Sequence, residues 1–282
     1  MSDTHSFSPP SLLAAAPRVI ALANQKGGVG KTTTAINLGT ALAAIGEEVL
    51  IVDLDPQGNA STGLGIDRKL RLRSTYDLMV GDCILSEVAM ETAVPRLSVA
   101  PSTMDLLGVE LEIASRSDRA FRLRRAIAAH VQRAESIRGR NYSYVLVDCP
   151  PSLNLLTINA LSASHSILVP LQCEFFALEG LSQLLQTVER VKHALNPELT
   201  VHGIVLTMFD SRNNLAGQVV SDVRAHMGEA VYDTVIPRNV RISEAPSHGK
   251  PVLLYDFKST GSQAYLRLAS EIIQREKRLR AA

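Results

Sequence analysis

The most informative segment of this chain reads Lys26-Gly27-Gly28-Val29-Gly30-Lys31-Thr32-Thr33. An apolar run over residues 19–23 precedes it and predicts a short buried strand, while the apolar pattern over residues 35–42 that follows predicts a helix. A glycine-rich turn between a strand and a helix can bend until several backbone N–H groups point at one anion, and the helix N-terminus adds partial positive charge. The segment therefore predicts a loop that binds phosphate groups.

This loop also supplies the side chains that a magnesium-bound nucleoside triphosphate requires. Lys31 can reach the β- and γ-phosphates, and the Thr32 hydroxyl can bind Mg²⁺. We expect the nucleotide phosphates to be held by Gly28, Val29, Gly30, Lys31, Thr32 and Thr33.

Two positions depart from the general pattern G-x-x-x-x-G-K-[ST]. Gln25 occupies the first glycine position, so the chain must enter the loop in a backbone conformation open to an ordinary L-residue. Lys26 lies close in sequence to Lys31 and is poorly placed to serve the same phosphate oxygens. Lys26 is therefore either a solvated surface lysine or a group that reaches a nucleotide across a dimer interface.

The segment from Asn24 to Leu38 resembles the deviant Walker A motif of the ParA/Soj-type partition ATPases, a branch of the P-loop NTPases. The resemblance continues in residues 52–59, 145–151, 172–181 and 236–251, and it spans about residues 18–275. Gln25 favours this subgroup, because the MinD and nitrogenase-iron-protein relatives typically have glycine there. The resemblance implies a single P-loop ATPase domain over residues 18–282.

Apolar strands alternate with helical segments along the rest of the chain. The pattern predicts strands at residues 19–23, 49–54, 97–100, 144–147, 167–171, 204–208 and 231–236, with helices that include residues 178–195 and 215–227. Near-continuous apolar strands separated by helices predict an α/β fold with a mostly parallel, doubly wound sheet. Ligands should bind at the carboxyl ends of its strands. Residues 60–96 are the least regular part, and we expect them to form a flexible surface insertion.

Three carboxylates follow predicted strands and are candidates for the chemistry. Asp53 and Asp55 lie two residues apart, which would put them on one face of their strand. Asp148 ends another apolar strand, where a lone Asp is usually a turn former. The resemblance implies that Asp148 orients Mg²⁺ through water, that Asp53 supports the Mg²⁺ shell, and that Asp55 positions or activates the attacking water. It thus assigns metal binding to Thr32, Asp53 and Asp148, and catalysis to Lys26, Lys31 and Asp55.

Residues near the C-terminus are candidates for contacts to the base and to DNA. Pro237 and Asn239 match the adenine-contacting loop of the resembling family, although a turn role alone would explain both. Arg212, Arg241 and Lys250 match positions where that family places basic residues for non-specific DNA binding, although each could be an ordinary surface charge. Such contacts would be made to phosphates, and would therefore be sequence-blind and sensitive to salt.

The formal net charge of +1 predicts no nucleic-acid binding by overall charge, so any DNA contact needs a local patch. Residues 116–140 are rich in arginine, with apolar positions interleaved. They predict an amphipathic helix with a solvated basic face, and the alternative is a contribution to a DNA-facing surface.

The remaining features concern cellular context. The cysteines Cys83, Cys149 and Cys173 show no C-x-x-C spacing and predict reduced thiols in a cytosolic protein. Residues 1–17 are rich in Ser, Pro and Ala and predict a disordered tail rather than a signal peptide. An apolar stripe over residues 262–280 predicts a packed terminal helix, because only Leu279 could serve a membrane anchor on its last turn.

The resemblance implies an ATPase with weak intrinsic activity that uses ATP and Mg²⁺ to segregate chromosomal or plasmid DNA, in the cytoplasm and associated with the nucleoid. Its expected partners are a second copy of the chain in an ATP-dependent homodimer, double-stranded DNA bound without sequence preference, and a ParB-like centromere-binding protein. No membrane partner is expected. The alternatives are a MinD-like membrane-surface ATPase that places the division site, an electron-transfer ATPase like the nitrogenase iron protein, and a non-hydrolysing switch. The three cysteines do not match the iron-protein pattern.

Overall fold

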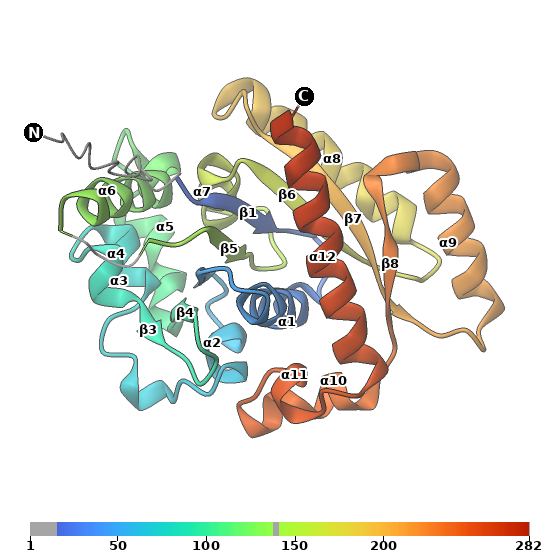
Figure 1. The fold of residues 1–282 in the computed structure, drawn as a ribbon. Helices are drawn as coiled ribbons and strands as arrows, with labels where there is room; N and C mark the ends of the chain where they lie inside the picture. Colours follow the sequence, from blue (N-terminus) through green and yellow to red (C-terminus); the bar gives the residue numbers. More distant parts are fainter. Residues whose placement is uncertain (1–15, 138–140, 282) are drawn as a thin grey trace, which may run out of the picture.

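The computed structural model describes residues 16–137 and 141–281, and its centre is a sheet of eight strands (Figure 1). The strands are β1 (Arg18–Leu22), β2 (Val49–Asp53), β3 (Met90–Glu91), β4 (Leu97–Ala100), β5 (Tyr144–Asp148), β6 (Ser166–Gln172), β7 (Thr200–Phe209) and β8 (Val231–Pro237). Their order across the sheet is β3-β4-β2-β5-β1-β6-β7-β8. Every neighbouring pair is parallel except β3 with β4 at the edge.

All the strands predicted from the apolar runs are present, and the mostly parallel sheet is confirmed. Every residue of β2 and β5 is buried, as expected for central strands covered on both faces. β3 was not predicted, because two residues are too few to carry a period.

Helices connect the strands. They are α1 (Lys31–Ala44), α2 (Asn59–Gly63), α3 (Thr75–Val80), α4 (Leu85–Val88), α5 (Val109–Glu112), α6 (Arg122–Ile137), α7 (Leu155–Ala163), α8 (Ala177–Ala194), α9 (Asn214–Met227), α10 (Val240–Glu244), α11 (Val252–Tyr255) and α12 (Thr260–Ala281). The predicted helices at residues 178–195 and 215–227 correspond to α8 and α9 within one residue at each end.

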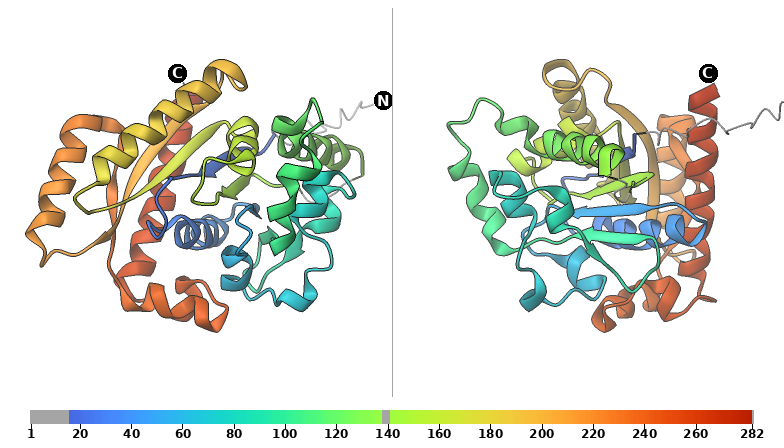
Figure 2. Two further views of the ribbon diagram at one scale, coloured as in Figure 1. Left: turned by 180° about the vertical axis from the view of Figure 1, so that it is seen from behind. Right: turned by 60° about the vertical axis from the view of Figure 1, so that its left-hand side comes forward.

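The two faces of the sheet carry separate apolar cores, because strand side chains alternate between the faces. Ile20 and Leu22 of β1 pack with residues of α1 and α12, whereas Val19 and Ala21 pack with residues of α6, α7, α8 and α9. The red α12 and the green α6 accordingly lie on opposite sides of the sheet (Figure 2). The doubly wound arrangement is thus confirmed.

Two expectations from the sequence need correction. Residues 60–96 are not a surface insertion: they form α2, α3, α4 and β3, and they bury Leu78, Met79, Leu85 and Val88 in the core. These elements are short and are stabilised by local caps, such as the capping box of Ser74 and Asp77 on α3. They are too short to show a repeating pattern of apolar residues in the sequence. The arginine-rich helix begins at Arg122 rather than near residue 116, after a short 3₁₀ turn. Its expected end at residue 140 and the tail expected over residues 1–17 lie partly outside the described residues.

The C-terminal helix packs against the molecule as the sequence predicts. Tyr265, Leu268 and Ile272 of α12 are buried against α1 and the sheet. The Leu279 side chain lies outside the described side chains. Within the described part of the chain, no helix is both long and apolar enough to cross a membrane.

Two turns from distant parts of the sequence meet at Gly65 and Gly249. Both residues have positive φ angles, 82° and 61°. A Cβ atom on Gly65 would lie 2.9 Å from the Gly249 carbonyl oxygen, and one on Gly249 would lie 2.9 Å from the Gly65 Cα atom. The turn after α2 therefore packs backbone against backbone on the turn after α10, at a distance that only glycine permits on both sides.

Candidate functional site

The phosphate-binding segment forms the loop between β1 and α1, at the carboxyl end of the sheet's central strands (Figure 1). Gly28 and Gly30 have φ angles of 76° and 90°, a region that L side chains rarely adopt. Gly30 is the N-cap of α1, so the first backbone N–H groups of the helix open onto the loop. Gln25 is not among the described residues with positive φ, which confirms the backbone expected for it.

Neighbouring elements fix the two ends of this loop. The Asn24 side chain donates to the Pro170 carbonyl oxygen at 2.9 Å and accepts from the Lys26 backbone N–H at 3.0 Å. The Thr207 hydroxyl of β7 donates to the Val29 carbonyl oxygen at 2.9 Å. These two anchors were not identified from the sequence, because neither Asn24 nor Thr207 has a pattern that indicates its partner.

The two lysines of the loop have different environments. Lys31 is buried, and its Nζ donates to the Lys26 carbonyl oxygen at 2.9 Å. Burial lowers the pKa of Lys31, and the nearby carboxylates Asp148 and Asp55 oppose this shift. The Lys26 side chain is 46% exposed and forms an ion pair with Glu174, which follows β6. The Lys26 side chain therefore points away from the phosphate-binding loop, whereas the Lys31 side chain points into it.

Asp53 and Asp148 end adjacent strands and are partners in the register of β2 and β5. Both are fully buried. Asp53 accepts hydrogen bonds from the Ser61 backbone N–H at 2.9 Å, the Ser61 hydroxyl at 2.6 Å and the Asp55 N–H at 3.2 Å. Among the described residues, neither carboxylate oxygen of Asp148 has a hydrogen-bond partner of normal geometry.

Burial raises the pKa of both carboxyl groups. The pKa of Asp53 rises to about 6, although its hydrogen bonds from Ser61 and Asp55 oppose the shift. The pKa of Asp148 rises well above its usual value through burial and then through repulsion from Asp53, while the Thr32 hydroxyl and Lys31 lower it. A buried carboxylate with unused oxygens next to a threonine hydroxyl suits a hard cation such as Mg²⁺. Among the described residues, no group of three or more His, Cys, Asp or Glu side chains is arranged to hold a metal, so phosphates and water would have to supply its other ligands.

Asp55 does not share a strand with Asp53, contrary to expectation, because β2 ends at Asp53. Asp55 lies half-buried in the loop that follows, and its Oδ1 accepts from the Gln57 N–H at 3.0 Å. Asp55 is thus the most accessible of the three carboxylates.

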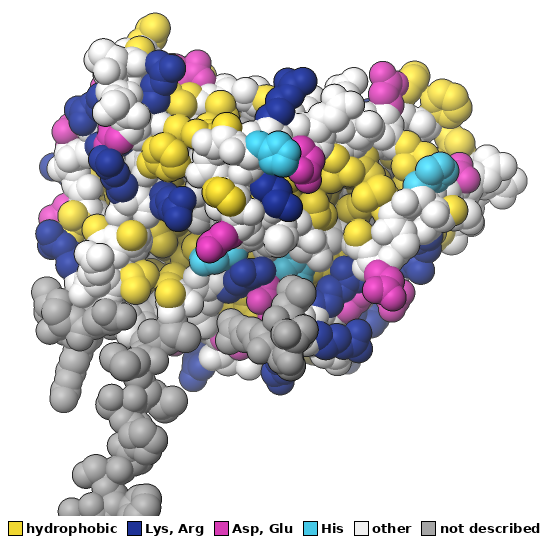
Figure 3. Space-filling model, turned by 90° about the horizontal axis from the view of Figure 1, so that it is seen from above, with side chains coloured by type: hydrophobic (Ala, Val, Ile, Leu, Met, Phe, Trp, Pro, Cys, Tyr) yellow, Lys and Arg dark blue, Asp and Glu magenta, His cyan; other side chains and the backbone are white. Residues whose placement is uncertain are grey.

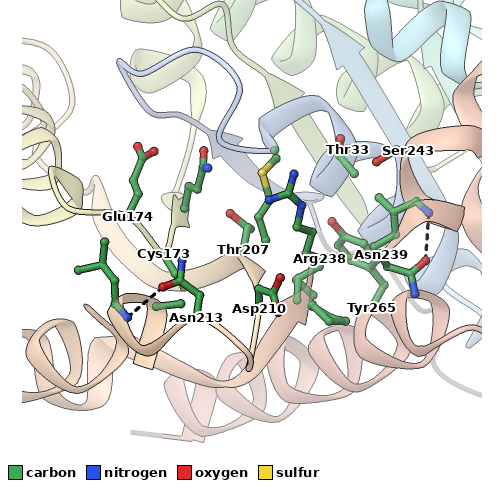
Figure 4. Close-up of a pocket in the computed structure, with 18 of the residues that line it drawn as sticks. Thr33, Cys173, Glu174, Thr207, Asp210, Asn213, Arg238, Asn239, Ser243 and Tyr265 are labelled. Carbon is green, nitrogen blue, oxygen red and sulfur yellow. Dashed lines mark hydrogen bonds between the residues drawn. The ribbon is translucent and has the colours of Figure 1, made fainter. Parts of the chain in front are cut away.

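A pocket of about 470 Å³ lies between β7, β8 and α10, next to the phosphate-binding loop (Figure 4). Its wall includes Gly30, Thr33, Pro237 and Asn239, which places the predicted base-binding residues next to the phosphate loop. Asn239 caps α10, accepting from the Arg241 N–H at 2.8 Å, and its amide donates to the Thr260 hydroxyl at 2.8 Å. The turn role considered for Asn239 is therefore present, and any contact with adenine would be additional.

Met208 and Arg238 are among the residues that line this pocket and that sequence reasoning missed. Met208 in β7 has a φ angle of 53°, which is uncommon for a residue other than glycine. The Arg238 side chain rises beside Thr207 in Figure 4. Arg238 lies between Pro237 and Asn239 in the sequence, and this position could have identified it as a pocket residue.

The three candidate DNA-binding residues lie outside the pocket wall, and two of them are already paired. Arg212 makes two bonds to the Asp210 carboxylate, at 2.9 and 2.7 Å. Arg241 contacts Glu244 at 3.0 Å and Asp256 at 3.4 Å. Lys250 is exposed. DNA phosphates would have to compete with these carboxylates, and the assignment stays a prediction.

Basic side chains elsewhere do not form one large patch on the face seen in Figure 3. Among the described residues of that face, Lys and Arg side chains are interspersed with acidic and apolar ones. Some arginines of the 116–140 stretch have local partners: Arg122 donates to the Met79 carbonyl oxygen at 2.8 Å and pairs with Asp118, as does Arg125. These contacts favour a structural role for part of that stretch.

Comparison with known proteins identifies the family to which this chain belongs. A family described as an AAA domain matches residues 17–201. The chain is 60% identical to the chromosome partitioning protein ParA of Caulobacter vibrioides over 92% of this chain and 95% of that protein. It is 52% identical to the sporulation initiation inhibitor protein Soj of Bacillus subtilis over 90% of this chain and 98% of that protein.

A solved Mycobacterium smegmatis structure described as a cobyrinic acid a,c-diamide synthase with a bound ATP analogue and magnesium is 36% identical. Its TM-score is 0.79, and the match covers 93% of this chain and 96% of that chain. The identity to the partition proteins is higher than this, and it extends over nearly their whole length. This chain therefore belongs to the ParA/Soj family of chromosome partitioning P-loop ATPases.

Proposed function

We propose that ATP joins two copies of this ATPase face to face, with Lys26 of each copy reaching the phosphates bound by the other. The observation that carries this proposal is the apolar surface around Lys26. Phe175 and Phe176, which follow the Lys26 partner Glu174, are 74% and 61% exposed. Leu153 and Leu111 are 39% and 84% exposed. Large exposed apolar side chains beside a polar site are typical of an interaction surface.

The connection of Leu153 and Leu111 to this surface comes from two contacts. A Cβ atom on Gly27 would lie 4.0 Å from Pro151, so the segment leading to Leu153 borders the phosphate loop. Glu110 of α5 accepts from the Leu155 N–H at 2.7 Å, which joins α5, the helix of Leu111, to the start of α7. A second copy facing this loop would cover these side chains and exclude water from both nucleotides.

Within each site, Lys31 and the loop N–H groups would hold the phosphates, and Thr32 and Asp148 would hold Mg²⁺. Asp53 supports the Mg²⁺ shell indirectly, through the loop that its hydrogen bonds shape. Mg²⁺ would neutralise the charge that develops on the phosphates during transfer. Asp55 would orient the attacking water, since it is a half-buried carboxylate on the loop after β2.

The dimer would bind double-stranded DNA through phosphate contacts from Arg212, Arg241 and Lys250, in the cytoplasm and on the nucleoid. A ParB-like protein bound at the centromere would accelerate hydrolysis and release the dimer. The high identity to proteins named for chromosome partitioning supports a chromosomal cargo over a plasmid one.

The Asp55→Ala variant tests the central part of this proposal. It should keep ATP binding and accumulate as an ATP-bound dimer, because the phosphate cradle is intact while the water is no longer positioned. Light scattering and phosphate release measure the two effects, with Asp82→Ala as a control that removes an exposed carboxylate elsewhere. Wild-type turnover would show that another residue holds the water, and a monomer in ATP would exclude the face-to-face dimer.

DNA binding is tested by titrations with ATP, with ADP and without nucleotide, at two salt concentrations. Tight binding only with ATP, weakened by salt, is the expected result. Binding that ignores nucleotide would contradict the proposal, and ATP-dependent pelleting with liposomes would favour a membrane-surface ATPase instead.

A further inference from the structure

Arg71 is a buried arginine beneath the loop that carries Asp55. Its residue surface is only 8% exposed, although arginine is rarely buried without a carboxylate partner. Its hydrogen-bond acceptors are all neutral oxygens: the carbonyls of Gly58, Ser102 and Ile66 and the hydroxyl of Thr62. The nearby charge of Asp53 favours the buried guanidinium, but taking it out of water with only neutral hydrogen-bond partners remains costly.

The acceptors of Arg71 belong to three segments that surround the loop carrying Asp55. Nη1 donates to the Ser102 carbonyl oxygen at 3.0 Å and to the Gly58 carbonyl oxygen at 3.5 Å. Nη2 donates to the Thr62 hydroxyl at 2.8 Å and to the Ile66 carbonyl oxygen at 2.8 Å. One guanidinium thus connects the end of the Asp55 loop, helix α2 and the segment after β4.

Ser102 carries this constraint to Asp55. The Ser102 hydroxyl donates to the Asp55 carbonyl oxygen at 2.6 Å, and the Ser102 N–H donates to the Ser61 hydroxyl at 3.1 Å. Ser61 in turn donates to Asp53, which accepts from the Asp55 N–H. The backbone of Asp55 is therefore held on both sides, by Ser102 at its carbonyl and by Asp53 at its N–H.

Gly58 shows how closely Arg71 approaches this loop. A Cβ atom on Gly58 would lie 2.4 Å from Arg71 Nη1 and 3.1 Å from the Ser102 carbonyl oxygen. Gly58 also has a φ angle of 64°, so both space and conformation require glycine. The guanidinium lies against the loop backbone and leaves no room for a side chain there.

We propose that Arg71 is a positioning residue for ATP hydrolysis, which fixes the Asp55–Gly58 loop against Ser102 so that the Asp55 carboxylate faces the attacking water. This inference rests on the role proposed above for Asp55. The planar fork of arginine is essential to it, because a lysine ammonium is a single point and cannot bridge four acceptors on three segments.

The test measures steady-state ATP hydrolysis by the full-length Arg71→Lys and Ser102→Ala variants, alone and combined. Arg71→Lys should lower kcat by about 10- to 100-fold, because a small misplacement of a positioned group has effects of that size. KM for ATP should change by less than about threefold, because the phosphate cradle is untouched. Arg73→Lys is the matched control, since Arg73 lies two residues away, is exposed and pairs with Asp77.

The combined variant separates positioning from general destabilisation. If Arg71 acts through Ser102, the loss in kcat for the double variant should be smaller than the product of the two single losses. Should Arg71→Lys fail to fold, Ser102→Ala decides alone, and a wild-type kcat for it would overturn the proposal.

Two results would contradict the inference while leaving the proposed function intact: a wild-type kcat for Arg71→Lys when Asp55→Ala is inactive, or a raised KM with unchanged kcat. Normal hydrolysis by Asp55→Ala would instead remove the role of Asp55 on which the inference depends.

Discussion

Asp53 and Asp148 sit side by side at the ends of β2 and β5, yet Asp53 accepts three hydrogen bonds and Asp148 accepts none of normal geometry from the described residues. This difference supports the roles proposed above, in which Asp53 shapes the loop that carries Asp55 and Asp148 binds Mg²⁺. Two buried carboxyl groups this close also disfavour each other's ionisation, so the metal-free site should hold protons that Mg²⁺ would replace.

Asp148→Asn should stabilise the protein without nucleotide at pH 8 and abolish the extra stabilisation that Mg²⁺ adds to ATP. The amide keeps the shape of the side chain, removes a carboxyl group that ionises readily in the unfolded chain but not when buried in the fold, and binds Mg²⁺ poorly. Thermal unfolding with and without ATP, each with Mg²⁺ or EDTA, measures both effects. An undiminished Mg²⁺ effect in the variant would exclude Asp148 from the metal site.

Stability without nucleotide should fall as pH rises from about 4 to about 6, through the ionisation of Asp53. Its pKa is about 6 in the folded chain against an unfolded value near 3.8, so in this window the folded state keeps a proton that the unfolded state has lost. The contribution is complete below the unfolded pKa and is lost as pH passes the folded pKa, a change on the order of 3 kcal/mol. Urea unfolding at several pH values in this range, for the wild type and for Asp53→Asn, measures the change. If the free energy of unfolding of the two proteins depends equally on pH, the prediction is wrong.

Lys31→Ala should abolish nucleotide binding, because the cradle loses the buried cation aimed at the β- and γ-phosphates. Isothermal titration with ATP is the measurement. The control is Lys69→Ala, which removes an exposed lysine on the surface. Unchanged ATP affinity in Lys31→Ala would disprove the assignment of the loop.

Lys26→Ala should bind ATP but remain a monomer, because Lys26 pairs with Glu174 in its own chain and is proposed to act only across the interface. Light scattering with ATP, in an Asp55→Ala background that suppresses turnover, gives the oligomeric state. A normal ATP-dependent dimer would show that Lys26 is a spectator.

Arg241→Ala should reduce the slope of log affinity for DNA against log salt concentration by about 2, because a dimer would lose two phosphate contacts at about 0.9 each. The existing pairs with Glu244 and Asp256 make this a demanding test. Arg73→Ala is the control, since both arginine side chains are 52% exposed and paired with a nearby carboxylate. An unchanged slope would indicate that Arg241 does not contact DNA phosphates and would leave Arg212 and Lys250 as the candidates.

The sequence predicted the features that depend on short stretches of neighbouring residues. Buried parallel strands are continuous apolar runs, so the strands and the doubly wound sheet could be inferred directly. The glycine turn between a buried strand and a helix could also be inferred, and the structure bears it out with positive φ angles at Gly28 and Gly30. Asp148 could be placed at a strand end because the run from Tyr144 leads straight to it.

The sequence did not reveal contacts between distant segments. Arg71 is a charged residue in a polar stretch, and nothing local indicates that it is buried beneath Gly58 and Ser102. The pairing of Lys26 with Glu174 likewise depends on how β6 ends beside β1. The prediction that Asp53 and Asp55 share one strand was wrong, because β2 ends at Asp53. A period-two pattern does not show where a strand ends.

The contact between Gly65 and Gly249 has a practical consequence for engineering this protein. Neither turn can accept an inserted reporter domain without separating the backbone of the other, because no flexible side chain lies between them to absorb the change. Gly228 also has a positive φ angle, 51°, but no atom lies within 4 Å of a Cβ atom placed on it. A fluorescent tag intended to follow this ATPase in living cells therefore belongs in the open turn at residue 228, well removed in sequence from the glycine pair.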